Sequence, residues 1–126
     1  MKYIKTFETV NHYLVYHGSD SENITEFDLN RIGKRVSKLG FFFTSDKDFA
    51  EMFGENVSAH LLTLNNPFII DQMEWYDWRD IKNGDAWFVN KRNSLIKKGY
   101  DSIIAQKEDG MSDTIIAFYP KQISNV

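Results

Sequence analysis

The segments Tyr16-His17-Gly18-Ser19 and Gly40-Phe41-Phe42-Phe43-Thr44-Ser45 are two apolar runs that each end abruptly in small polar residues. Such runs predict two strands whose ends lie side by side and frame a cleft. The first strand end offers an imidazole and, at Gly18, a backbone without a side chain. The second offers an aromatic wall. Together these groups suit a flat heteroaromatic ring that is attached to a sugar.

Length and composition limit the class of protein. With 126 residues, of which 42% are hydrophobic, we expect a single domain spanning residues 1–126. The absence of cysteine excludes a disulfide framework, a thiol nucleophile and a cysteine metal site. No run approaches the roughly 18 apolar residues of a membrane span, and no secretory signal is evident, so we expect a cytoplasmic protein without a membrane partner. The net charge of −3 disfavours a general attraction to nucleic acid.

Turn residues divide the chain into about six short strands and two or three helices. We expect an α+β fold built on a curved, largely antiparallel sheet with short flanking helices. Ser45 is expected to cap a helix over Asp46–Phe53, and Asp85 to cap one that ends before Gly99. Strands are expected at Leu14–His17, Phe41–Thr44, Val57–Leu64, Phe68–Ile70, Ser102–Gln106 and Thr114–Phe118.

The chemistry of the two strand ends leaves alternatives open. The N–H and C=O of Gly18 can pair with a carboxamide and His17 can bond a ribose hydroxyl, although the same residues also suit a plain turn. Phe42 points opposite to Phe41 and Phe43, so only one of these sets can face the cleft. Asp113 precedes the last long strand, where a carboxylate can stabilise positive charge on a sugar or can simply be a solvated turn residue. No spacing of His, Asp and Glu resembles a metal site, so we expect none.

Four further motifs follow these segments in order. Ala50-Glu51-Met52-Phe53 lies in the first expected helix, and Leu61-Leu62-Thr63-Leu64-Asn65-Asn66-Pro67 forms a strand and its turn. Downstream come Gly99-Tyr100-Asp101-Ser102-Ile103-Ile104 and the closing strand Ile115-Ile116-Ala117-Phe118-Tyr119-Pro120, which leads into Lys121-Gln122-Ile123. In order and spacing, the chain from Tyr16 to Ile123 resembles the ADP-ribosyltransferase superfamily. The likeness is closest to its poly(ADP-ribose) polymerase and diphtheria-toxin-like branch, with a His-Tyr-Glu site, and to the small phage-type domains within it.

The resemblance implies a co-substrate, NAD, and a role for each matching position. In the family the histidine binds the ribose of NAD, the glycine backbone clamps the nicotinamide amide, and two aromatic rings stack on nicotinamide. Carried over, the cofactor-binding residues are His17, Gly18, Ser19, Phe42, Thr44 and Phe53, and the catalytic residues are His17, Asp113 and Thr114. The chain departs from the pattern at two places, because Phe42 stands at the tyrosine and Thr114 at the catalytic glutamate.

These departures leave three hypotheses of function. The first is a mono-ADP-ribosyltransferase, an NAD-consuming glycosyltransferase that modifies a macromolecular acceptor, namely a host protein, as a phage-derived effector or toxin. The second is a catalytically degenerate module of the same fold that binds NAD or a partner protein. The third is transfer to nucleic acid, for which Lys34, Arg35 and Lys38 would supply a local basic patch.

Overall fold

The computed structural model describes residues 4–7, 10–19, 38–81, 84–108 and 112–125. Its elements follow the order expected from the turn residues, with one strand added at each end. In chain order they are β1 (Ile4–Phe7), β2 (Val10–Ser19), β3 (Phe41–Thr44), α1 (Lys47–Ala50), the 3-10 turn η3 (Glu51–Phe53), β4 (Asn56–Thr63), β5 (Pro67–Ile70), α2 (Gln72–Arg79), α3 (Asp85–Lys97), β6 (Ser102–Ala105), β7 (Thr114–Ala117), η4 (Pro120–Gln122) and β8 (Ile123–Asn125).

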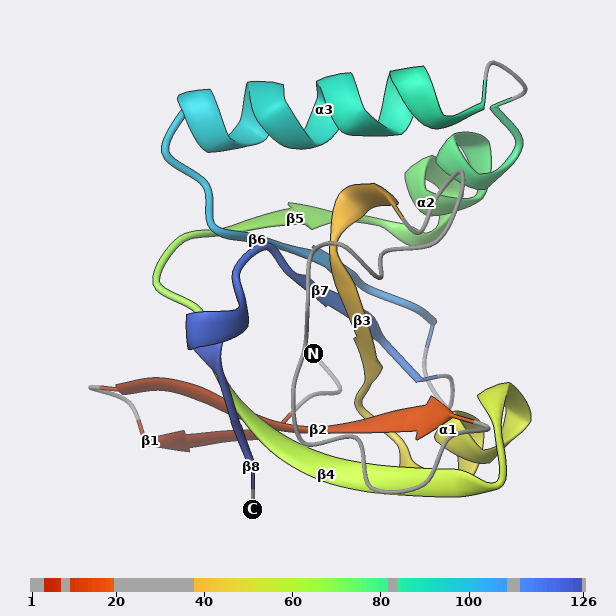
Figure 1. Ribbon diagram of the computed structural model, residues 1–126, viewed down its shortest axis with the longest axis vertical. Helices are drawn as coiled ribbons and strands as arrows, with labels where there is room; N and C mark the ends of the chain where they lie inside the picture. Colours follow the sequence, from red (N-terminus) through yellow and green to blue (C-terminus); the bar gives the residue numbers. More distant parts are fainter. Residues whose placement is uncertain (1–3, 8–9, 20–37, 82–83, 109–111, 126) are drawn as a thin grey trace.

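The strands form one sheet in the order β5-β6-β7-β3-β2-β4-β8, and β1 pairs with β2 outside this path. Neighbouring strands are antiparallel except for the parallel pair β5 and β6. Figure 1 shows that β1, β2, β4 and β8 form one half of the molecule, while β3, β7, β6 and β5 lie above them with α2 and α3. The expected α+β fold with a split, mostly antiparallel sheet is therefore confirmed.

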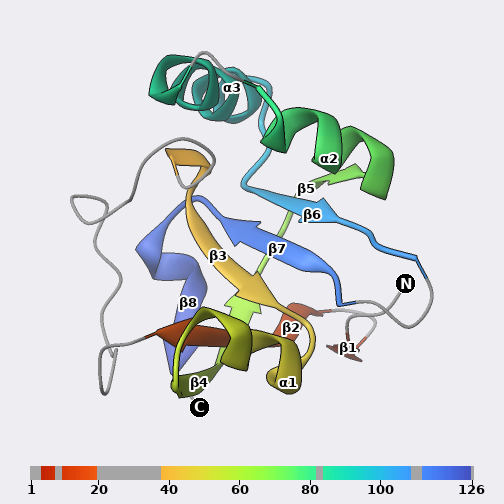
Figure 2. The same cartoon turned by 90° about the vertical axis from the view of Figure 1, so that its right-hand side faces the viewer.

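The two halves of the sheet are joined by very little pairing. β2 and β4 are paired without interruption from His12↔Thr63 to Ser19↔Asn56. β2 and β3, by contrast, share the single ladder position Tyr16↔Thr44 within the described residues. The sheet therefore opens along this seam, and the view in Figure 2 shows β3 crossing steeply over the end of β2.

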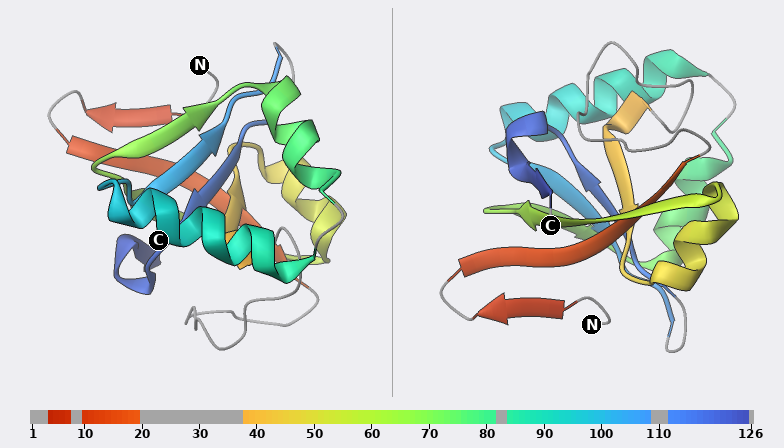
Figure 3. Two further views of the ribbon diagram at one scale, coloured as in Figure 1. Left: turned by 90° about the horizontal axis from the view of Figure 1, so that it is seen from above. Right: turned by 60° about the horizontal axis from the view of Figure 1, so that its bottom comes forward.

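Hydrophobic clusters on the two faces of the sheet explain why β3 keeps this position. Phe41 and Phe43 are buried in a cluster with Tyr13, Val15 and residues of β4, β6 and β7. Phe42 points the other way and packs against the cluster beneath α2 and α3. Figure 3 shows α3 lying across this face of the sheet. The alternation expected for the Phe41–Phe43 run is confirmed, because each face of the strand has its own apolar partner.

Both predicted helix caps are wrong by one residue. The N-cap of α1 is Asp46, whose side chain accepts a hydrogen bond from the Asp48 N–H, and not Ser45. Ser45 is engaged elsewhere, because its N–H donates to the Asp113 carbonyl and its Oγ accepts the Asp113 N–H. The N-cap of α3 is Gly84, so Asp85 is the first helical residue. There its negative charge interacts favourably with the positive end of the helix dipole.

Gly40, at the start of β3, generates a stability prediction. Its φ is +152°, and an added Cβ would collide with the Ala117 carbonyl oxygen of β7. Gly40→Ala should therefore lower the unfolding free energy in two ways. The backbone conformation is unfavourable for alanine, and overpacking against β7 should cost about 1–3 kcal/mol. Chemical denaturation of purified protein would measure the loss of unfolding free energy.

Gly99→Ala is the matched control for this prediction. Gly99 also has positive φ (+97°), but nothing lies within 4 Å of the position an added Cβ would occupy. Its substitution should cost roughly 1–2 kcal/mol through the backbone alone. An equal loss in the two variants would show that β3 and β7 are not as close as described.

Candidate functional site

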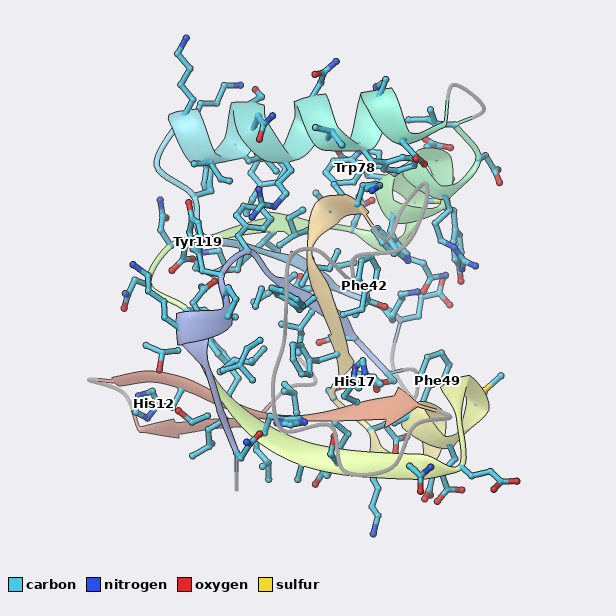
Figure 4. The ribbon with its side chains drawn as sticks, viewed as in Figure 1. His12, His17, Phe42, Phe49, Trp78 and Tyr119 are labelled. Carbon is cyan, nitrogen blue, oxygen red and sulfur yellow. The ribbon has the colours of Figure 1, made fainter. Side chains whose placement is uncertain are left out.

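A cavity of about 270 Å³ lies where the sheet opens between β2 and β3. It is framed by the ends of these strands, by α1 and α2, and by the residues that flank the β6–β7 turn. Figure 4 shows His17 and Phe49 near the end of β2, with Phe42 above them. The described residues that line the cavity are Tyr16, His17, Gly18, Phe42, Phe43, Thr44, Phe49, Trp75, Arg79, Lys107 and Thr114.

His17 is oriented by a hydrogen bond across the seam. Its Nδ1 lies 2.9 Å from the carbonyl oxygen of Phe42, and because a carbonyl only accepts, Nδ1–H is the donor. In the neutral ring this leaves Nε2 as the acceptor nitrogen. The ring also packs against Phe43, with 5.7 Å between centroids. The imidazole is thus held at the cavity wall next to Gly18.

A second histidine lies behind the first one on the same face of the sheet. His60 is 1% exposed, and its Nε2 lies 2.6 Å from Ser58 Oγ, which in turn lies 3.4 Å from the backbone oxygen of His17. Burial lowers the pKa of His60; a hydrogen bond to Asn125 opposes this shift and the nearby His17 adds to it. His60 therefore supports β2 behind the cavity as a neutral ring.

Only part of the expected aromatic wall lies within the described residues. Phe42 lines the cavity and lies 6.0 Å from the ring of Trp75, which is itself buried in the core beneath α2. The side chain of Phe53, predicted to stack on the ligand, lies outside the described residues, as does that of Ser19. Phe49, one helical turn earlier than Phe53, lines the cavity. It was not predicted from the sequence as a site residue, although it lies in the same expected helix as Phe53.

Thr44 lines the cavity, but its hydroxyl is engaged in local structure. Thr44 Oγ1 accepts the Asp46 N–H at 2.9 Å and contacts Ser112 Oγ. These bonds tie the end of β3 to the start of α1 and to the residues before β7. Thr44 therefore shapes the cavity through its backbone and methyl group more than through a free hydroxyl.

The structure separates Asp113 from Thr114, the two residues predicted at or next to the position of the family's catalytic glutamate. Thr114 lines the cavity, opposite Thr44 in the ladder between β3 and β7. Asp113 does not line it; it is 1% exposed and its Oδ1 accepts the Lys107 N–H at 2.9 Å. Adjacent strand residues point to opposite faces, which explains why only one of the pair reaches the cavity.

Arg79 and Lys107 are cavity residues that sequence reasoning missed. Arg79 ends α2, and Lys107 lies two residues beyond Ala105, the ladder partner of Thr114. Burial and the neighbouring Arg79 lower the pKa of Lys107, while Asp113 acts in the opposite direction. No local motif marks either residue, because only the pairing of β6 with β7 and the docking of α2 bring them to the site.

Metal and membrane sites were not expected from the sequence. Among the residues that the structure describes, no three His, Asp or Glu side chains gather in a way that could bind a metal ion. Over the same residues, no helix has the length and apolar character needed to cross a membrane. Of the basic cluster Lys34, Arg35 and Lys38, the first two lie outside the described residues.

The buried His60 generates a prediction about pH. Its pKa in the folded protein lies below its value in the unfolded chain, so the unfolded state binds more protons once the pH falls below about 6.5. Stability contributed by neutral His60 is therefore present above that pH and is lost as the pH falls through the interval between the two pKa values. The unfolding free energy of the wild type should decline as the pH falls below about 6.5, and His60→Gln should flatten the decline. An unchanged slope in His60→Gln would contradict the assignment.

Comparisons with known proteins agree with this geometry. The family model for ADP-ribosyltransferase domains in polyvalent proteins matches residues 11–126, which confirms the resemblance seen in the motifs. A crystal structure titled as that of an anti-CRISPR protein has the same fold, with a TM-score of 0.51 and 17% identity. The alignment covers 93% of this chain and 98% of that one. Among curated proteins, no match was found. Because the family model covers nearly the whole chain, the protein belongs to the family of ADP-ribosyltransferase domains found in polyvalent proteins.

Proposed function

We propose that this chain is a mono-ADP-ribosyltransferase that moves one ADP-ribose unit from NAD to a protein acceptor. The observation that supports this most is the cavity at the β2–β3 seam, where His17, fixed by the Phe42 carbonyl, lies beside Gly18. NAD is the co-substrate of the family. The wider role follows the same proposal: an effector of phage origin that acts in the cytoplasm as a single domain.

The residues present fit the nicotinamide end of NAD. Among the described residues, β2 and β3 share no ladder position beyond Tyr16↔Thr44, and Gly18 lies at the cavity wall, where its backbone can meet a carboxamide. Phe42, Phe49 and Trp75 give the cavity flat apolar surfaces on which an aromatic ring can stack. The acceptor nitrogen Nε2 of His17 can take a hydrogen bond from a ribose hydroxyl.

In the proposed reaction the bond between the ribose C1′ and the nicotinamide nitrogen breaks. Its electron pair stays with the nitrogen, so the cationic pyridinium leaves as neutral nicotinamide and positive charge develops on the sugar. His17 and Gly18 would hold the two parts in a fixed geometry, which lowers the entropic part of the barrier. Thr114 would bond the ribose or the incoming acceptor, and Asp113 would act indirectly by fixing the backbone at Lys107.

A second candidate is a module that binds NAD without transferring ADP-ribose. It is favoured by one observation, namely that the position of the family's catalytic glutamate is Thr114 and that no Asp or Glu of the described residues lines the cavity. Calorimetry with NAD, combined with an assay for free nicotinamide, distinguishes the two. Binding without nicotinamide release would favour the module.

His17→Ala should abolish transfer, because it removes both the ribose contact and the bond that aligns the seam. With labelled NAD and bacterial lysate, we expect labelling to fall about 100-fold or more. His12→Ala is the matched control, since His12 lies at the opposite end of the same strand (Figure 4), and it should label as the wild type does. Equal labelling by wild type and His17→Ala would end the transferase proposal.

The roles of Thr114 and Asp113 can be tested with one near-isosteric substitution at each position. Thr114→Val removes only the hydroxyl from the cavity and should lower the labelling rate about tenfold. Asp113→Asn keeps an oxygen that can accept the Lys107 N–H, so it should lower the rate no more than about threefold. Asp113→Ala removes that acceptor and should lower the unfolding free energy by about 1–3 kcal/mol. A complete loss of transfer in a folded Asp113→Asn would instead make the Asp113 carboxylate catalytic.

A further inference from the structure

Large apolar side chains that are exposed to solvent gather beside the cavity. In the described part of the chain Met52 is 76% exposed, Met73 72% and Tyr76 37%, and these three belong to η3 and α2, next to cavity residues. The other two exposed residues of this kind, Ile69 and Val89, lie singly on β5 and α3. Single exposed apolar residues are normal on a protein surface, whereas a group of them beside a cavity indicates a contact surface.

Helical spacing places this group at the entrance of the cavity. Met52 follows Phe49, a cavity residue, by three positions, and residues three apart lie on one face of a helix. On α2 Met73 and Tyr76 are also three apart, and three positions further is Arg79, which lines the cavity. Figure 2 looks at this side of the molecule, with α1 below β3 and α2 above it. We call Met52, Met73 and Tyr76 the apolar rim.

The segments that carry the apolar rim are strongly acidic. Residues 46–55 and 71–80 together have eight acidic and two basic side chains, all of them exposed, and hence a net charge of −6. The whole chain has a net charge of −3, so the other residues together are positive. On α2, Glu74 and Asp77 each come one position after Met73 and Tyr76, which places an acidic row beside the apolar one.

This combination of charge and apolar surface discriminates between possible occupants. A nucleic acid or an anionic membrane surface would be repelled by the acidic side chains. A second copy of the chain, if it used the same face, would bring two acidic surfaces together. A protein surface with Lys and Arg side chains around an apolar centre is complementary in both respects. Exposed methionines suit such a contact, because their unbranched side chains adapt to the shape of a partner.

We propose that the apolar rim and the acidic side chains around it form a docking surface for a partner protein whose contact surface is rich in Lys and Arg around an apolar centre. The surface lies outside the cavity, on the two helical segments that frame it. The inference concerns neither NAD nor the group that is transferred, so it goes beyond the proposed function. It applies equally to a transferase and to a module that only binds NAD.

Short synthetic peptides test the chemistry of the docking surface. By calorimetry we would measure binding of an amphipathic peptide made of lysine, arginine and leucine. Its two controls replace every basic residue by glutamate or every leucine by serine. The basic amphipathic peptide should bind about tenfold more tightly than either control, and added salt should weaken its binding. Equal affinity for either control, or no measurable binding of the basic peptide, would overturn the proposal.

Substitution of both methionines tests the location of the docking surface. Met52→Ser combined with Met73→Ser should weaken binding of the basic peptide about tenfold and leave the affinity for NAD unchanged. Both side chains are largely exposed, so the Tm should stay close to that of the wild type. Val89→Ser is the matched control, because it removes an exposed apolar side chain from α3 and should bind the peptide as the wild type does. Unchanged peptide affinity in the double variant, or a parallel loss of NAD binding, would contradict the inference.

Other occupants would give different results. Binding of a single-stranded DNA oligonucleotide that is weakened by the double substitution would assign the surface to nucleic acid. Sedimentation that finds dimers of the wild type and monomers of the double variant would assign it to a second copy of the chain. Either result overturns the proposal. Failure of the proposed function would instead appear as no nicotinamide release by the wild type, and it would leave the comparison of peptides unaffected.

Discussion

The hydrogen bond from His17 Nδ1 to the carbonyl of Phe42 is the contact on which the site depends. β2 and β3 meet at one ladder position, Tyr16↔Thr44, and beyond it the imidazole bonds across the seam in place of a backbone ladder. Such a bond contributes only about 1 kcal/mol. Its importance is geometric, because it sets the opening of the sheet, the tautomer of His17 and the direction of the acceptor nitrogen at once.

The surrounding structure keeps that seam open without letting the halves separate. On one side β2 is paired along its length with β4, and on the other β3 is paired with β7 at Phe41↔Ala117 through Thr44↔Thr114. The alternating phenylalanines of β3 enter different clusters, so sliding the strand by one residue would exchange their faces. The buried, neutral His60 and its contact with Ser58 support the back of β2. A rigid frame therefore surrounds the cavity at the seam.

Electrostatics distinguish this member from the pattern of its family. Thr114 lines the cavity together with Lys107 and Arg79, while the carboxylate of the nearby Asp113 accepts a hydrogen bond from the backbone of Lys107. At the start of β7, Thr114 and not the adjacent Asp113 is therefore the residue that lines the cavity.

The sequence by itself determined the family, the α+β class and the succession of the central strands along the chain. It also determined that Phe42 faces away from Phe41 and Phe43. These features depend on local periodicity and on motifs in fixed order. It also located His17 and Gly18 at a strand end. It did not indicate β1 and β8, which are short edge strands stabilised by their neighbours, nor the exact helix caps, where Ser45 was diverted by Asp113. The approach of Arg79 and Lys107 to Thr114 was decided only by the tertiary structure. Their positions depend on the pairing of β6 with β7 and on the docking of α2, whose Trp75 packs into the core. Contacts between such distant segments leave no periodic pattern in a single sequence.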